Sequence, residues 1–159
     1  MRFARVWVSL LVSACGGVTP TGAPPAKTSG GEAESPEQAC LAEAAAARSP
    51  RAGGPEKITL SHILVRHRDL KRPEGATRSR GQACLKAREA RERLLAGGEW
   101  DEVAKKYSDA GDATGGKLGS VSKGELDETF ANAAFALDAG ELSHVVETPR
   151  GFHVIARTE

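Results

Sequence analysis

Apolar and polar residues alternate along residues 58–66, where β-branched and aliphatic side chains dominate. Successive side chains of a strand point to opposite faces of a sheet. One face of this run carries His62 between Leu60 and Leu64, and the other face also carries apolar residues, Ile63 and Val65. The pattern therefore predicts a central strand that is covered on both sides. His62 would lie among apolar neighbours, where its imidazole needs a hydrogen-bond partner.

Three later segments repeat apolar residues with the period of an amphipathic helix. Residues 82–96 carry an alanine-rich stripe with charged side chains on the other faces, and glycines at 97–98 end the pattern. A second helix is predicted from Glu99, and a third after Asp127, which can cap it. The apolar stripes of these two helices are Trp100, Val103, Ala104 and Tyr107, and Phe130, Ala133, Ala134 and Leu137.

Short apolar runs at 118–121, 145–148 and 152–157 predict further strands, the last two joined by a turn at 149–151. The order of elements is strand, two helices, short strand, helix and two strands. This order predicts a compact α+β domain with a small, largely antiparallel sheet and helices around it.

The N-terminal residues have the composition of a targeting segment. Arg2 and Arg5 supply positive charge, and the apolar run at 6–12 is too short to span a bilayer, which takes about 20 helical residues. Small residues lead into Cys15, which resembles the bacterial lipobox, where the peptide is cut before a cysteine that receives a lipid. We therefore expect a signal peptide at 1–14 and lipidation of Cys15. The alternative is an ordinary signal peptide with an incidental cysteine.

Residues 15–57 predict a lipidated cysteine followed by a flexible tether. The part before residue 36 is rich in Gly, Pro, Thr, Ser and Ala and shows no hydrophobic period. An alanine-rich stretch at 36–48 predicts a short helix that Ser35 can cap. A helix of this length is stable only when it is docked, and the sequence does not show whether it docks on the domain.

Two further cysteines, Cys40 and Cys84, each lie in a Gln-Ala-Cys-Leu tetrapeptide. A compartment outside the cytoplasm permits a disulfide, which requires the two Cα atoms to lie within ~7 Å of one another. The sequence does not show whether the two segments meet. A disulfide and a pair of small buried thiols therefore both remain open.

Charge is nearly balanced, with 22 Lys and Arg against 21 Asp and Glu, so no global excess favours nucleic acid as a partner. The four histidines and three cysteines show no spacing typical of metal ligands, and we expect neither a metal nor a cofactor. Recognition by charge must come from a local cluster.

Five segments of the C-terminal part resemble, in order, motifs of the parvulin family of peptidyl-prolyl cis-trans isomerases. They are Ser61-His62-Ile63-Leu64-Val65; Trp100-Asp101-Glu102-Val103-Ala104 with Tyr107-Ser108; Gly115-Gly116-Lys117-Leu118-Gly119; Phe130 to Leu137 with Gly140-Glu141-Leu142-Ser143; and Val145 to Thr148 with Gly151 to Ile155. The resemblance implies a parvulin domain at 58–159 with the FKBP-like α+β fold of that family, a four-stranded antiparallel sheet surrounded by helices.

The same resemblance implies the catalytic residues. His62 and His153 match the paired histidines of the family, which orient a hydrogen-bond network, and Thr148 matches a hydroxyl near them. Two satisfied core histidines are the alternative. The family usually carries Cys or Asp a few residues after the Tyr-Ser pair, where this chain has Ala110. Asp109 and Asp112 flank that position, and we expect Asp109 to supply the acidic group.

Two sets of residues match positions that bind substrate. Leu118, Leu126 and Phe130 match the positions that line the proline pocket, with generic core packing as the alternative. A basic cluster, made of Arg66, Lys71 and Arg72, resembles the branch of parvulins that prefers phosphorylated Ser or Thr before proline. Three cations around one site can bind a dianion, although a solvated charged loop and a preference for Glu-Pro or Asp-Pro segments remain alternatives.

We therefore expect a peptidyl-prolyl cis-trans isomerase that acts on proline-containing polypeptides outside the cytoplasm and prefers an anionic residue before proline. The chain is expected to be a monomer in the bacterial cell envelope, anchored by lipid to a membrane and facing the periplasm or the cell exterior. The alternative function is a parvulin-fold chaperone or binding module with little catalytic activity.

Overall fold

The computed structural model of the protein describes residues 34–111 and 114–159. The predicted signal peptide at 1–14, Cys15 and the first part of the predicted tether lie outside these residues, as does Asp112. Within the described part of the chain, no helix combines the length and the apolar character needed to cross a membrane.

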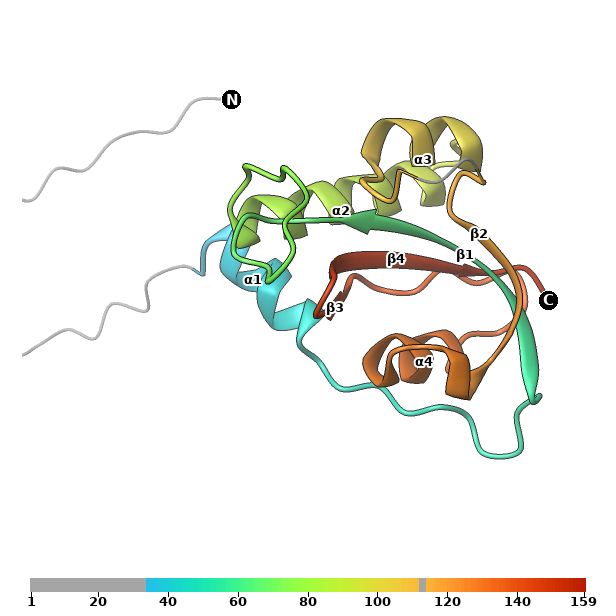
Figure 1. Ribbon diagram of the computed structural model, residues 1–159. Helices are drawn as coiled ribbons and strands as arrows, with labels where there is room; N and C mark the ends of the chain where they lie inside the picture. The colour runs from blue at the N-terminus through green and yellow to red at the C-terminus, as the bar shows by residue number, and fades with distance from the viewer. Residues whose placement is uncertain (1–33, 112–113) are drawn as a thin grey trace, which may run out of the picture. The chain divides into compact units, whose positions relative to one another are not determined.

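The described helices and strands follow one another in the order that the sequence predicts. They are α1 (Pro36–Ala44), β1 (Lys57–Val65), α2 (Arg80–Leu95), α3 (Trp100–Tyr107), β2 (Lys117–Ser122), the 3-10 helix η1 (Lys123–Glu125), α4 (Glu128–Ala134), β3 (Val146–Thr148) and β4 (Gly151–Arg157). The strands form one antiparallel sheet in the order β2-β1-β4-β3 (Figure 1). The predicted α+β class and four-stranded antiparallel sheet are confirmed, while η1 was not predicted.

Side-chain caps determine where the helices begin. Ser35 and Ser79 each form a capping box with the glutamine three residues later, and Asp127 accepts hydrogen bonds from the first turn of α4. The two Gln-Ala-Cys-Leu tetrapeptides therefore occupy the same place in α1 and α2: the glutamine closes the box, and the cysteine follows two residues later.

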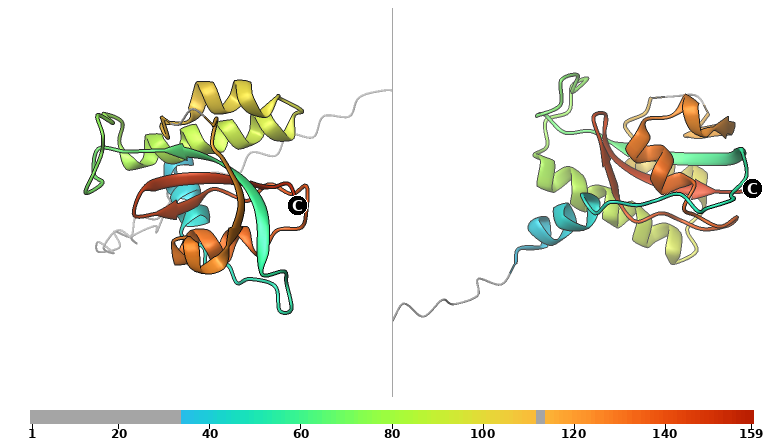
Figure 2. Two further views of the ribbon diagram at one scale, coloured as in Figure 1. Left: turned by 45° about the vertical axis from the view of Figure 1, so that its right-hand side comes forward. Right: turned by 90° about the horizontal axis from the view of Figure 1, so that it is seen from below.

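Helices cover both faces of the sheet, so the domain has two apolar clusters. In the first cluster, α1, α2 and α3 pack against the face of the sheet that carries Ile63, Val65, Phe152 and Val154. In the second, α4 packs against the opposite face, which carries Ile58, Leu60, Val146 and Ile155. Figure 2 shows α2 and α3 on one side of β1 and β4 and α4 on the other. Since side chains alternate along a strand, His62 and His153 lie on the α4 face.

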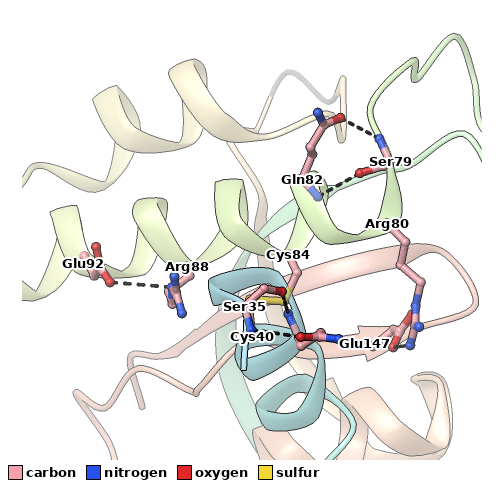
Figure 3. The surroundings of a disulfide bond; sticks show 10 residues. Ser35, Cys40, Ser79, Arg80, Gln82, Cys84, Arg88, Glu92 and Glu147 are labelled. Carbon is pink, nitrogen blue, oxygen red and sulfur yellow. Dashed lines mark hydrogen bonds and ion pairs between the residues drawn. A yellow bond between two sulfur atoms is a disulfide. The ribbon is translucent and has the colours of Figure 1, made fainter. Parts of the chain in front are cut away.

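Helix α1 docks on the domain, which resolves the question that the sequence left open. Cys40 and Cys84 form a disulfide with their Cα atoms 6.0 Å apart, and both cysteines are fully buried (Figure 3). Gly81 of α2 lies directly under the Glu37 side chain of α1, which would have to move if position 81 carried a Cβ atom. The alternative of two free thiols is therefore not what the structure shows.

Residues 45–56, here called the strap, continue from α1 past α4 to β1 (Figure 1). Arg48 donates a hydrogen bond to His144 Nδ1 at 3.2 Å. Arg51 donates to the backbone carbonyls of Phe135 and Ala136, and its guanidinium lies 2.6 Å from an Asp138 carboxylate oxygen. Arg48 and Arg51 thus tie the strap to the domain at two positions within the stretch predicted as a flexible tether.

Candidate active site

Two histidines from adjacent strands meet at the centre of the α4 face of the sheet. His62 lies on β1 and His153 on β4, and their Nδ1 atoms are 3.1 Å apart. Their rings are nearly parallel, with an interplanar angle of 17° and 5.3 Å between centroids. The antiparallel register pairs Leu64 with His153 and His62 with Ile155, which brings the two imidazoles together diagonally.

Thr148 on β3 extends the pair into a three-residue relay. Its hydroxyl lies 2.9 Å from His153 Nε2 and accepts a hydrogen bond from the backbone N–H of Arg150 at 3.1 Å. Each contact between imidazole nitrogens or with the hydroxyl needs one donor and one acceptor. The proton positions along Thr148, His153 and His62 are therefore linked, so that a change of tautomer at one member requires a matching change at the others.

Burial keeps His153 uncharged. It is 3% exposed, and burial, followed by the nearby His62, Arg150 and Arg66, holds the pKa of its imidazole well below the ordinary value of 6.5. A neutral imidazole can both donate and accept, whereas a charged one only donates. The relay can therefore orient polar groups of a ligand without carrying a positive charge at His153.

Phe130 of α4 closes the pair from the other side. Its ring meets His62 edge-on at 5.7 Å between centroids and His153 edge-on at 5.1 Å. Leu126 packs in the same apolar cluster as Phe130, whereas Leu118 lies on the edge strand β2 and is 39% exposed. Of the three residues predicted to line the proline pocket, the structure thus places Leu126 and Phe130 in one cluster and leaves Leu118 open to solvent.

A glycine positions β2 against the histidine strand. The backbone N–H of His62 donates to the carbonyl of Gly116 at 2.8 Å. Gly116 has a φ of +80°, and a Cβ atom there would collide with the carbonyl oxygen of His62. The Gly-Gly-Lys-Leu-Gly motif therefore needs glycine at this position because of a backbone contact at the active-site strand.

Asp109, the predicted acidic group, takes part in a different set of contacts. Its carboxylate accepts a hydrogen bond from the Arg66 backbone N–H at 2.8 Å, pairs with Arg78, and lies 3.5 Å from Lys86 Nζ. The structure brings His62, His153 and Thr148 together but gives Asp109 the role of anchoring the end of β1. Action of Asp109 on a substrate stays a prediction.

Ala110 stands at the position where the family usually carries Cys or Asp, and it lies beside a pocket. Ala110 lines a pocket of about 320 Å³ together with Asp101, Ala104, Lys105, Ser108, Gly111, Gly115 and Gly116. A methyl group cannot donate or accept a hydrogen bond, so any polar contact with a twisted amide on this side must come from another residue.

The predicted basic cluster lines a second pocket of about 330 Å³. Arg66, Lys71 and Arg72 are joined there by Glu74, Pro149 and Arg150. We call this the anion pocket. It adjoins the relay, because Arg150 follows Thr148 by two residues and its backbone N–H contacts the Thr148 hydroxyl.

Two charged members of this pocket were not predicted from the sequence. Arg150 sits in the β3–β4 turn, far along the chain from the other cations, so only the fold brings it to them. Glu74 lies in a loop with many charges, directly after Pro73 in a Pro-Glu-Gly turn. The sequence did offer one signal for Arg150: it is a basic residue in the turn directly after Thr148, which matches the family's hydroxyl position.

No cluster of three or more potential metal ligands occurs among residues 34–111 and 114–159. The chemistry available at the site in the described residues is thus hydrogen bonding, apolar packing and positive charge.

Comparisons with known proteins show which family the domain resembles. The rotamase family model, described as a PPIC-type PPIase domain, matches residues 62–159. Peptidyl-prolyl cis-trans isomerase pin1 of Schizosaccharomyces pombe is 45% identical over 109 residues, a match that covers 64% of this chain and 62% of that protein. The foldase protein PrsA of Bacillus subtilis is 38% identical over 105 residues, covering 65% of this chain and 30% of that protein.

Solved structures show the same fold. Peptidyl-prolyl isomerase ESS1 from Candida albicans superposes with a TM-score of 0.58 at 34% identity, over 65% of this chain and 63% of that chain. This chain spans less than two thirds of the length of each of these three relatives. The family model begins at residue 62, so α1 and the strap lie outside it.

Proposed function

This chain belongs to the family of PPIC-type peptidyl-prolyl cis-trans isomerases, and from that premise we propose that it accelerates isomerisation of Xaa-Pro bonds in extracytoplasmic proteins, with a preference for an anionic Xaa. The observation that carries the preference is the anion pocket, in which four cations, Arg66, Lys71, Arg72 and Arg150, surround one hollow next to the histidine relay.

The reaction requires no bond cleavage. A prolyl amide resists rotation because of its partial double-bond character, with a barrier of ~18–20 kcal/mol. In the twisted transition state the amide loses resonance and charge separation, so an apolar surround and hydrogen bonds to the twisted form both lower the barrier. Phe130 and Leu126 supply apolar surface, and the His62–His153–Thr148 relay fixes polar groups beside it.

The anion pocket would hold the residue before proline. Its cations come from the end of β1, from the loop that follows and from the β3–β4 turn, so a substrate anion there draws three segments together. Because the pocket adjoins Thr148 and the relay contacts Phe130, an anion in the pocket places the next residue of the substrate near the pair of histidines. Binding energy gained at the anion then orients the amide.

Three features support a location outside the cytoplasm. The Cys40–Cys84 disulfide suits an oxidising compartment, and the predicted signal peptide at 1–14 precedes a lipobox-like Cys15. We propose that lipid on Cys15 holds the protein at the surface of a bacterial envelope membrane, where it meets unfolded clients as they emerge.

A proline-isomerisation assay on tetrapeptides with Glu, Ala or phospho-Ser before proline tests the proposed activity. We expect acceleration for all three peptides, with kcat/KM higher for the two anionic peptides than for Ala. Replacing both Lys71 and Arg72 with Gln should reduce the preference and leave the Ala peptide nearly unaffected, since these side chains are exposed and belong to the pocket. Equal rates for the Ala and anionic peptides would refute the preference, and absence of acceleration for every peptide would refute catalysis.

A binding module with little catalysis is the second candidate, and Ala110 favours it because no polar side chain stands at that position. The two functions differ in one measurement. A binding module would retain proline peptides at equilibrium, with a measurable Kd, while their cis-trans exchange stays at the uncatalysed rate of tens of seconds or longer.

A further inference from the structure

We propose that Glu74 is an internal competitor for the anion pocket: its carboxylate occupies Arg66 in the free protein and must be displaced by the anionic residue of a substrate. This inference rests on the proposed anion preference and identifies what opposes it.

The ion pair joins a fixed partner to a movable one. An Arg66 guanidinium nitrogen lies 2.9 Å from a Glu74 carboxylate oxygen. The Arg66 side chain is 14% exposed, and its guanidinium also donates to the backbone carbonyl of Asp109, while its own backbone N–H donates to the Asp109 carboxylate. The Glu74 side chain is 59% exposed. Arg66 is therefore held in place, and Glu74 is the partner that can leave.

The backbone holds Glu74 in an unusual conformation. Its φ is +47°, and among the described residues it is the one non-glycine residue with a positive φ. Gly75 follows with a φ of +82°, and the Ala76 N–H donates to the Pro73 carbonyl at 2.9 Å, which closes the turn. Left-handed conformations are unfavourable for residues with a Cβ atom. The turn thus carries a carboxylate to the pocket at a position where glycine or asparagine would fit with less strain.

Charge explains the competition. Glu74 and a substrate anion both seek the Arg66 guanidinium, which is mostly shielded from solvent and therefore attracts a carboxylate more strongly than an exposed cation does. A carboxylate or phosphate that enters must separate Glu74 from Arg66, so part of the attraction is spent in that exchange. A substrate with an uncharged residue before proline has no such exchange to make, so its turnover should depend on Glu74 less than that of an anionic substrate.

The test compares Glu74→Gln with the full-length wild-type protein. Affinity for a phospho-Ser-Pro peptide is measured by calorimetric titration, and kcat/KM is measured for phospho-Ser-Pro, Glu-Pro and Ala-Pro peptides. Removing a partly exposed ion pair should raise affinity for the phospho-Ser-Pro peptide, and kcat/KM for both anionic peptides, about twofold to fivefold. The Ala-Pro value should change less than the values for the anionic peptides, and the gain should shrink as salt is added.

Two further variants guard against trivial explanations. Glu74→Asn also removes the charge but tolerates the left-handed backbone, so it should reproduce the gain even if Glu74→Gln alters the turn. Glu92→Gln removes a surface carboxylate that lies 3.9 Å from Arg88 on α2, and it should change none of the values. If Glu92→Gln raises affinity for the anionic peptide as much as the Glu74 variants do, a general effect of net charge explains the gain, and the proposal for Glu74 is wrong.

The outcomes separate this inference from the proposed function. If the wild type prefers anionic peptides and neither Glu74 variant increases that preference, the competitor proposal is wrong and the proposed function stands. A wild type without preference whose Glu74 variants gain one supports the competitor and refutes the preference of the natural protein. If neither the wild type nor the variants distinguish anionic from Ala peptides, both proposals fail.

Discussion

Two histidines, His153 on β4 and His144 just ahead of β3, avoid protonation for the same physical reason. Burial is the main cause for each, and nearby cations add to it: Arg150 and Arg66 for His153, Arg48 and Arg91 for His144. The pKa of His144 is lowered to about 4. Its Nδ1 accepts from Arg48, and its Nε2 is buried without a hydrogen-bond partner among the described residues.

This burial predicts how stability depends on pH. In the unfolded chain both histidines have their ordinary pKa of 6.5, so below that pH the unfolded state binds protons that the folded state does not. The free energy of unfolding should therefore fall as pH decreases from about 6.5 towards 4. Urea denaturation at a series of pH values measures it. In His144→Gln the fall should be shallower, and an unchanged slope would show that His144 is not responsible.

The residues of the relay could be predicted from sequence because they sit on regular strands. Alternation along residues 58–66 put His62 on an apolar face, and the family motifs supplied His153 and Thr148 as partners. Glu74 and Arg150 could not be predicted in the same way. Their positions depend on turn geometry, including a positive φ at Glu74, and on contacts between segments far apart in the chain.

Helix α1 is held to the domain by a covalent link as well as by apolar packing. The disulfide connects residues 44 positions apart in sequence and joins α1 to α2. A crosslink over a loop of this size stabilises the folded state by roughly 2–4 kcal/mol, largely because it restricts the conformations open to the unfolded chain. The helix itself has nine residues, which is too short to be stable alone.

Removing the crosslink should therefore lower stability without removing the fold of the sheet. We expect the variant with Cys40→Ala and Cys84→Ala to unfold at a lower temperature than the oxidised wild type, with far-UV circular dichroism close to that of the wild type. Reducing agent should lower the Tm of the wild type and leave that of the variant unchanged. A wild-type Tm that does not respond to reduction would show that the bond does not form in solution or adds no stability.

The sequence predicted where the helices lie along the chain better than it predicted how they pack against one another. Capping residues and apolar periods located α1, α2 and α4 to within a few residues. Docking of α1 could not be derived, because a short alanine-rich stretch does not indicate which surface it packs against. The close approach at Gly81 and the contacts of Arg51 with the end of α4 involve single residues in stretches that look like ordinary helix and linker.

At the scale of the whole molecule, the segment ahead of the family domain has two parts. Helix α1 and the strap dock on the domain, and residues 1–33 lie outside the described residues. The proposal of a lipid anchor concerns the latter and is tested through Cys15. We expect the wild type, expressed in a bacterium with lipoprotein-processing enzymes, to sediment with membranes, and Cys15→Ser to appear in the soluble envelope fraction. Cys40→Ser, which removes another cysteine, should leave membrane association unchanged. Sedimentation of Cys15→Ser with membranes would contradict the anchor.

The disulfide also changes how mechanical tension would travel through the protein. A pull on the chain ahead of residue 34 reaches the domain at Cys40 and passes through the crosslink directly to Cys84 on α2. Residues 41–83 form a closed ring off that path, and the ring contains the strap, all of β1 with His62, and Glu74 with three cations of the anion pocket. As long as the bond is intact, tension along the N-terminal segment bypasses the histidine strand. In a reduced molecule the same pull would run along the strap into β1 itself.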